Sequence, residues 1–400
     1  MYLLIQARAE TPLGFRAGRD EAREETLSYV PGSALLGALA TAHLQLCPDR
    51  RDEFADFFLR GGAYLGNLYP ALPEETAGAE ADELRAARPI PRTARSCKRF
   101  PGFRSAARAS EQRHGVTDAL LAWSAFALSG AQDPTPLAKL RDCPECGQPL
   151  DSYRGFCGRS EGAEWAAGKA EQGFTTRVGI SRERGASSHG ILYTRDFLRA
   201  GSQFSGRWWV HDDLADSFLR FLGSVHREMP LRVGHNRTRG MGKLVLGEPA
   251  PVEADTADAV QARVARFTET LRAVAGSHAR HAWYLPLTTI ADCILPDGAG
   301  GFRQLLTPPV LLEEWGVATT ELVYCSVDIR RVSGWNGVAR LPKPDALAVA
   351  MGSVFVLAAE APPDWKALAT DQACGLGARR PEGFGAVVVA DPFHWEVKNA

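Results

Sequence analysis

The stretch GHNRTRGMGKLVL, residues 234–246, decides the fold, because it places a glycine-rich loop between a predicted helix at 212–229 and a predicted strand. A second stretch, GLGARRPEGFGAVVV at 375–389, follows a predicted helix at 361–373 and also leads into a strand. Its last two glycines lie 143 residues after the corresponding pair in the first stretch. The repeat therefore has the length of a domain, and we infer an internal duplication.

The chain is predicted to contain two domains of the α+β class. Its 400 residues are too many for one ordinary core, and each half mixes helices with short strands. The segment 248–258 is rich in Pro, Glu and Ala and has no core-forming pattern, which is typical of a linker. We expect an N-terminal domain at 1–247, a linker at 248–258 and a C-terminal domain at 259–400.

The composition is that of a packed globular protein, with 45% hydrophobic and 23% charged residues. The longest apolar stretches, such as SVFVLAA at 353–359, are far shorter than the roughly 20 residues of a membrane helix. The first residues, MYLLIQARAE, become polar too early for a signal peptide. We expect no membrane association and a cytoplasmic location.

The net charge of −1 excludes a globally basic protein, but the charge is locally uneven. Nine basic residues and one acid lie between Arg85 and Arg113. A solvated loop that pairs with the acidic residues before it is the alternative explanation. Candidate RNA contacts in this stretch and at a predicted hairpin tip are Arg92, Arg95, Lys98, Arg99, Arg182 and Arg184.

The two glycine loops are candidate anion-binding sites. Glycines permit positive φ and let a ligand approach main-chain N–H groups, while neighbouring guanidinium groups neutralise phosphate. Neither loop has the spacing of a nucleotide-binding P-loop, which disfavours ATP binding. The candidate RNA-binding residues of the first loop are Arg232, Gly234, His235, Arg237, Arg239, Gly240, Gly242 and Lys243, and those of the second are Gly375, Gly377, Arg379, Arg380, Gly383 and Gly385.

The segment CPECGQPLDSYRGFC, residues 143–157, has the pattern of a zinc knuckle. Cys143 and Cys146 form a C-x-x-C pair in a tight turn, and Cys157 follows as a third thiolate. We expect Cys97 to complete a tetrahedral Zn²⁺ site, with His114 as the second choice. Four protein ligands leave no open position, so the zinc would be structural and would stabilise an insertion at about 95–160.

Several segments resemble the RAMP proteins of CRISPR effector complexes. Besides the two glycine loops, these are YVPGSALLGALA (29–40), GILYTRDFLRAGSQFSG (190–206) and SGWNGVARLPKPDALAVAMGSVFVL (333–357). With the inserted knuckle, the sequence is most similar to the large two-domain RAMP subunit of type III-D complexes. Leu36 is a departure, because the family often has a basic residue at that point of its P-G-S helix.

The resemblance implies two ferredoxin-like (RRM-like) domains and binding of guide RNA (crRNA) through its 5′ repeat-derived tag. It also implies partners, namely a large polymerase-like subunit and backbone RAMP subunits. We expect no catalytic residues. The alternative is a metal-independent endoribonuclease that processes repeat RNA with His43, His189, Tyr193 or His235 as acid–base groups. A zinc-dependent hydrolase is disfavoured, because an all-thiolate site has no open position for water.

Overall fold

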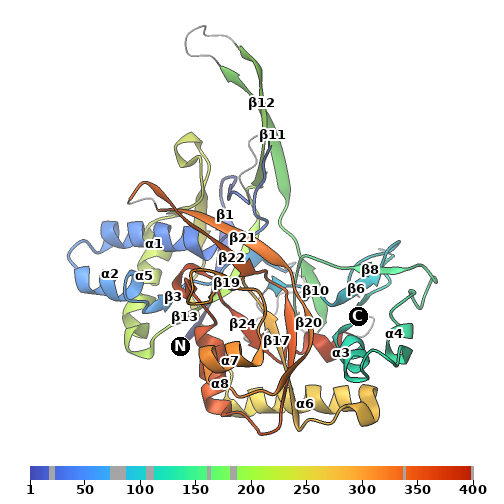
Figure 1. Cartoon of the computed structure of the whole chain (residues 1–400). Coiled ribbons are helices and arrows are strands. Elements are labelled where there is room, and N and C mark those ends of the chain that lie inside the picture. The colour runs from blue at the N-terminus through green and yellow to red at the C-terminus, as the bar shows by residue number, and fades with distance from the viewer. Residues whose placement is uncertain are drawn as a thin grey trace. The chain divides into compact units, whose positions relative to one another are not determined.

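The chain forms two compact units of mixed α and β structure (Figure 1). The computed structural model describes residues 1–17, 23–72, 87–104, 112–159, 164–180, 187–336 and 339–397. The first unit comprises 1–71, 168–252 and 381–383, and the second comprises 72–167, 253–380 and 384–400. The chain passes from the first unit to the second at several points, one of which lies between Val252 and Glu253. The predicted hairpin-tip residues Arg182 and Arg184 lie outside the described residues.

The first unit is built on an antiparallel sheet with the order β14-β15-β1-β13-β3. Its central strand is β1 (Tyr2–Ala9), whose alternating side chains are buried because they face the core. The remaining strands are β3 (Ala63–Tyr64), β4 (Tyr69–Pro70), β13 (Gln203–Val210), β14 (Leu231–Arg232), β15 (Lys243–Leu246) and β16 (Ala250–Val252). β16 pairs with β1, so this part of the predicted linker is a strand and not a free connection.

The helices of the first unit cover its core with regularly spaced apolar residues. In α5 (Ala215–Glu228), Phe218, Phe221, Leu222 and Val225 are buried, which is the spacing of one helical face. α1 (Gly32–Leu46) and α2 (Arg51–Phe58) contribute to the same core. A long hairpin of β11 (Gln172–Ile180) and β12 (Ser187–Leu198) adds to this unit and pairs with β2 (Arg23–Glu24).

The second unit has a four-stranded antiparallel sheet with the order β20-β23-β17-β24. These strands are β17 (Trp283–Thr289), β20 (Glu321–Ser326), β23 (Val354–Ala359) and β24 (Val387–Val389). β23 is buried along its whole length, in keeping with its continuous apolar run. The unit also contains α6 (Ala257–Ala275), α7 (Pro308–Trp315), α8 (Trp365–Cys374), α9 (Phe393–Glu396), β18 (Leu295–Pro296), β19 (Phe302–Arg303), β21 (Ile329–Asn336) and β22 (Leu341–Val349).

The two principal sheets share one topology. In the first unit β1 is followed by helices, β3, β13, α5 and β15, and the sheet runs β15-β1-β13-β3. In the second unit β17 is followed by α7, β20, β23, α8 and β24, and the sheet runs β24-β17-β23-β20. In both, the fourth strand lies beside the first, and the third separates the first from the second. Each glycine loop precedes the fourth strand.

The segment 72–167 groups with the second unit, whereas the insertion had been expected to belong to the N-terminal domain. It contains β5 (Arg88–Pro89), β6 (Ala94–Cys97), β7 (Val116–Asp118), β8 (Leu150–Ser152), β9 (Phe156–Arg159), β10 (Trp165–Gly168), α3 (Leu120–Leu128) and α4 (Thr135–Ala138). Buried polar contacts hold it in place. Arg88 pairs with Asp391 at 2.7 Å, and the His394 ring contacts Asp118 at 2.8 Å and Thr288 at 2.7 Å.

None of the helices in the described residues has the length and apolar character needed to cross a membrane.

Candidate RNA-binding loops and metal centre

The first glycine loop packs closely against the segment that follows β1. The Gly242 N–H donates to the Pro12 carbonyl at 2.9 Å, and the His235 N–H donates to the Gly14 carbonyl at 3.1 Å. Gly242 has a φ of +88°, and a Cβ there would lie 2.4 Å from the Val233 carbonyl oxygen. Gly242 is therefore required by close packing, and the N–H groups of Gly242 and His235 already have acceptors within the fold.

The side chains of this loop point outward and carry its positive charge. Arg232, Arg237 and Arg239 are all exposed, and no carboxylate among the described residues forms an ion pair with them. Lys243 differs, because its ammonium group forms an ion pair with Glu10. The loop thus presents three guanidinium groups to solvent, and these groups, more than the main-chain N–H groups, can bind phosphate.

The second glycine loop has fewer groups available to a ligand. The N–H groups of Gly375, Gly377 and Gly385 donate within the fold, to Asp371, Glu314 and Asp292.

Its arginines are half-buried. The Arg379 guanidinium lies 4.7 Å from the centre of the Phe384 ring, and Arg380 approaches the Cys374 carbonyl at 3.5 Å. Phe384 itself packs against a small apolar cluster that includes Ile294 and Val332. Gly383 is buried at a φ of +88°. These contacts leave the second loop with fewer groups available to a ligand than the first loop has.

A cluster of cysteine and histidine side chains can hold a metal ion. Cys97, His114, Cys143 and Cys146 place their ligand atoms within 4.8 Å of one another. The Sγ atoms of Cys97 and Cys146 are 3.5 Å apart, and Cys143 Sγ is 3.4 Å from His114 Nδ1. Gly147, at a φ of +66°, closes the turn after the C-x-x-C pair. The predicted ligands Cys97, Cys143 and Cys146 thus come together.

The prediction of Cys157 as a ligand is wrong. β9 pairs with β5, and this directs Cys157 into an apolar cluster with Ile90, Phe103 and Trp165. Burial raises the pKa of the Cys157 thiol to about 12, so it remains protonated at neutral pH. His114, the second choice in the sequence, takes the fourth position.

The surroundings of the cluster favour the metal-binding form of Cys97. Burial alone would raise the pKa of Cys97, but N–H groups of Phe100 and Arg99 outweigh burial and lower it, which favours the thiolate. The His114 Nε2 atom lies 3.7 Å from a carboxylate oxygen of Glu145, which also pairs with Arg104. A carboxylate behind the imidazole is a common outer-shell partner of a metal-bound histidine.

The described residues of the basic stretch belong to the second unit, whereas the first glycine loop belongs to the first unit. Arg92 forms an ion pair with Asp328 at 2.9 Å, and the Arg95 guanidinium donates to main-chain carbonyls. Lys98 and Arg99 are exposed, and the Arg99 guanidinium stacks on the Phe100 ring at 5.1 Å. Backbone hydrogen bonds of Tyr153 and Gly155 with Ala94 and Ile90 bring Arg154 close to Arg92 and Arg95. Arg154 is not among the RNA contacts predicted from the sequence.

The candidate acid–base residues do not form an accessible catalytic site in the described part of the chain. His43 is fully buried among Phe54, Phe57, Phe58 and Phe221, and burial lowers its pKa. The His235 ring packs over Gly14, where a Cβ would lie 2.7 Å from Nε2. The side chains of His189 and Tyr193 lie outside the described residues.

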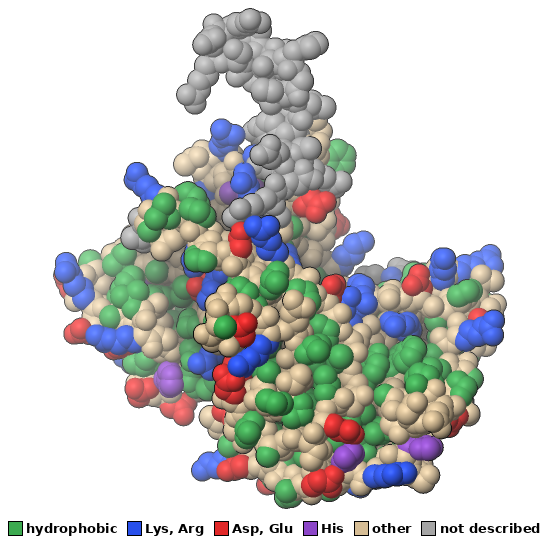
Figure 2. Space-filling view, viewed as in Figure 1, with side chains coloured by type: hydrophobic (Ala, Val, Ile, Leu, Met, Phe, Trp, Pro, Cys, Tyr) green, Lys and Arg blue, Asp and Glu red, His purple; other side chains and the backbone are tan. Residues whose placement is uncertain are grey.

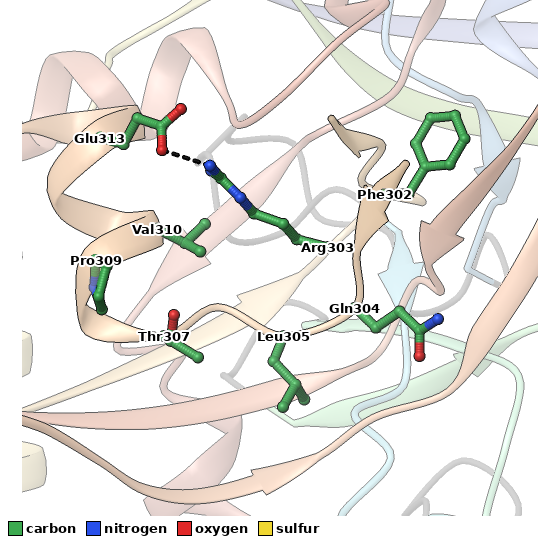
Figure 3. Close-up of a pocket in the computed structure, with 8 residues that line it drawn as sticks. All are labelled: Phe302, Arg303, Gln304, Leu305, Thr307, Pro309, Val310 and Glu313. Carbon is green, nitrogen blue, oxygen red and sulfur yellow. Dashed lines mark ion pairs between the residues drawn. The ribbon is translucent and has the colours of Figure 1, made fainter. Parts of the chain in front are cut away.

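A pocket of about 540 Å³ lies between β19 and the start of α7 (Figure 3). Its two charged lining residues, Arg303 and Glu313, form an ion pair at 2.6 Å, so they neutralise one another. The other lining residues are Phe302, Gln304, Leu305, Thr307, Pro309 and Val310. None of these is an acid–base or metal-ligating group suited to RNA cleavage.

Comparisons with known proteins identify the family. Two solved structures are similar over much of their length: the type III-B Cmr-beta complex bound to cognate target RNA and AMPPnP (12% identity, TM-score 0.42, 88% of this chain and 86% of the other) and Cmr4 (Cas7) of Pyrococcus furiosus (14%, 0.26, 62% and 100%). No curated protein matches the sequence. The model of the RAMP superfamily matches residues 6–245, which is more than half of the sequence. The chain therefore belongs to the RAMP superfamily.

Proposed function

We propose that the chain is a non-catalytic guide-RNA-binding subunit of a type III CRISPR effector complex, most similar to the large RAMP subunit of type III-D systems. The observation that carries this proposal is the exposed arginine group of the first glycine loop in a chain that belongs to the RAMP superfamily. Arg232, Arg237 and Arg239 lack carboxylate partners among the described residues. Unpaired guanidinium groups beside a tightly packed loop suit phosphate of an RNA backbone.

Each unit, in this proposal, contains a ferredoxin-like domain. The shared strand order, with one helical connection after the first strand and another after the third, is the βαββαβ pattern of that fold. The resemblance of the sequence to type III-D subunits supports the finer assignments. These are contact with the 5′ repeat-derived tag of crRNA and assembly with a polymerase-like subunit and backbone RAMP subunits.

The Cys97–His114–Cys143–Cys146 cluster is proposed to bind a structural Zn²⁺. Three sulfur ligands and one nitrogen are a donor set that zinc prefers, and four protein ligands leave no position for a reacting water. The ion would join β6 to the knuckle turn, because Cys97 ends that strand. Its role would be to stabilise the segment 72–167 and not to catalyse a reaction.

The proposal is tested by titrating labelled repeat-derived RNA with the full chain at several salt concentrations. The Arg237→Ala/Arg239→Ala double variant should reduce the salt dependence of the binding constant by a slope of about 1.4, which is 0.7 per lost contact with single-stranded RNA. The matched Arg379→Ala/Arg380→Ala variant should lose less affinity. An unchanged slope in the first variant would place the RNA site elsewhere.

The absence of catalysis is a separate part of the proposal. Purified chain incubated with repeat RNA without added metal should leave the RNA intact. The accumulation of a defined cleavage product would support the endoribonuclease instead, and variants of His189, Tyr193 and His235 would then identify the acid–base groups.

A further inference from the structure

Three arginines that are separated in the sequence come together on the segment 72–167 of the second unit. These are Arg92, Arg95 and Arg154. Backbone hydrogen bonds at 3.1 and 2.9 Å join residues 153–155 to 90–94, so Arg154 lies across from Arg92. The pairing of β6 with β8 places Arg95 opposite Ser152. Backbone pairing thus brings Arg154 next to Arg92 and Arg95, although it lies about 60 residues later in the sequence.

The three side chains are held in different ways. Arg92 pairs with Asp328 at 2.9 Å, and Arg95 Nη1 donates to the carbonyls of residues 92 and 94 at 3.1 and 3.0 Å. Arg154 is exposed and forms no ion pair with any described carboxylate. Its pKa is lowered, first by partial burial and then by the charges of Arg92 and Arg95. The cluster therefore contains three positive charges, of which the Asp328 carboxylate neutralises one.

This excess positive charge can attract an anionic ligand from outside the unit. Two arginines are already oriented by carboxylate or carbonyl partners, so little side-chain entropy is lost when they bind an anion. Figure 2 shows Lys and Arg side chains gathered where Figure 1 places β6 and β8. Guanidinium groups arranged in this way suit the closely spaced charges of a phosphodiester backbone.

An aromatic pair next to the cluster favours nucleic acid over an acidic protein surface. The rings of Trp123 and Tyr324 are stacked, with centroids 6.3 Å apart and planes inclined by 9°. Both side chains are half-buried. Burial raises the pKa of the Tyr324 hydroxyl, and the nearby positive charge of Arg95 opposes this shift. Aromatic rings beside arginines are typical of surfaces that bind single-stranded nucleic acid through stacking and phosphate contacts.

We propose that Arg92, Arg95 and Arg154 form a second RNA-phosphate site on the zinc-knuckle segment, built from residues that belong to neither glycine loop. The site rests on the proposed RNA-binding function. It adds Arg154 to the RNA contacts and gives the segment 72–167 a direct binding role. Its ligand is the phosphodiester backbone of single-stranded RNA, so its contribution is independent of base sequence.

Arg154→Ala is the variant that tests this site most directly, because the side chain is exposed and anchors no other described group. Arg141→Ala is its control, since Arg141 lies on the same segment with a side chain that is 86% exposed. Both variants and the wild type are titrated with a labelled single-stranded RNA bearing the repeat-derived tag, and with one of unrelated sequence. Thermal melts verify that the variants fold.

Arg154→Ala should lower the salt slope by about 0.7 for both RNAs, which corresponds to about a fivefold loss of affinity at 0.1 M salt. Arg141→Ala should match the wild type. An unchanged slope for Arg154→Ala, with normal binding by the wild type, overturns this site and leaves the proposed function standing. Failure of the wild type to bind either RNA overturns both. Normal RNA binding by Arg154→Ala with impaired subunit assembly would assign the cluster to an acidic protein partner instead.

Discussion

The buried ion pair between Arg88 and Asp391 provides a sharp test of how the segment 72–167 is fixed within the second unit. The Arg88 side chain is 4% exposed and that of Asp391 is 0% exposed, with a 2.7 Å contact between them. Asp391 also accepts the Phe393 N–H at 2.9 Å. Arg88→Met removes the cation and leaves a buried carboxylate, which is expected to cost about 3–5 kcal/mol of unfolding free energy at pH 7.

The loss should depend on pH in a predictable direction. In the wild type, burial raises the pKa of Asp391, but the charges of Arg88 and His394 outweigh it, so the net pKa is lowered. This stabilisation is present above the unfolded pKa of about 3.9 and is lost as the pH falls. Without Arg88, burial would dominate and raise the pKa of Asp391. The stability of the variant would then fall as the pH rises from about 4 through that raised value.

The deficit of Arg88→Met should therefore be smaller at pH 5 than at pH 7, by up to about 2.7 kcal/mol for two pH units. Urea unfolding followed by tryptophan fluorescence at both pH values measures it. The Arg88→Met/Asp391→Leu variant removes both charges and should recover stability and lose the pH dependence. A deficit below about 1 kcal/mol, or one equal at both pH values, would refute the reasoning.

Three further predictions concern the metal centre, the second loop and a surface histidine. His114→Ala and Cys143→Ser should each lower the zinc content of purified protein, whereas Cys157→Ser should retain zinc, as measured by elemental analysis. Phe384→Ala should lower the free energy of unfolding by about 2 kcal/mol in a denaturation experiment. This is less than for a fully buried ring, because Phe384 is half-buried. Loss of RNA binding with normal stability would instead show that the ring stacks on a base. His281 contacts Glu360 at 2.5 Å and Glu321 at 2.9 Å, and although burial lowers its pKa, these hydrogen bonds raise it overall. The stabilisation of the fold by protonated His281 is thus complete below the unfolded pKa of about 6.5 and is lost as the pH rises through the raised value. The melting temperature should therefore fall more between pH 6 and 8 for the wild type than for His281→Gln.

The repeated order of strand, helix, glycine loop and strand could be predicted from the sequence, because each of these elements has a local sequence pattern. Both glycine loops follow an amphipathic or partly apolar helix and precede a short apolar strand, and the two units share one strand order. The strand at 250–252 could not be predicted in the same way. Ala250 and Pro251 have little strand propensity of their own. They form a strand with Val252 because β15 pairs only with Ala7–Ala9 of β1 and leaves Tyr2–Leu4 on the same side for this segment.

Only part of the metal site could be predicted from local sequence, because the other ligands depend on which strands pair. The C-x-x-C spacing places Cys143 and Cys146 at one turn regardless of the rest of the fold. The choice between Cys157 and His114 depends instead on strand pairing, because β9 pairs with β5 and directs the thiol of Cys157 into an apolar cluster. Arg154 was missed for the same reason, since only the contact between 153–155 and 90–94 brings it to the other arginines.

The glycines and the arginines of the loops have separable roles. A Cβ at Gly385 would lie 2.0 Å from the Leu376 carbonyl oxygen, and one at Gly242 would lie 2.4 Å from that of Val233. Any substitution at these positions must displace backbone, so loss of RNA binding in a glycine variant would report damage to the fold. Arg237 and Arg239 are exposed and can be truncated without such displacement. Loss of binding in a normally folded arginine variant would therefore be a stronger argument for direct contact with RNA than the same loss in a glycine variant. The glycine pattern that identifies the family thus does not by itself identify the residues that contact RNA.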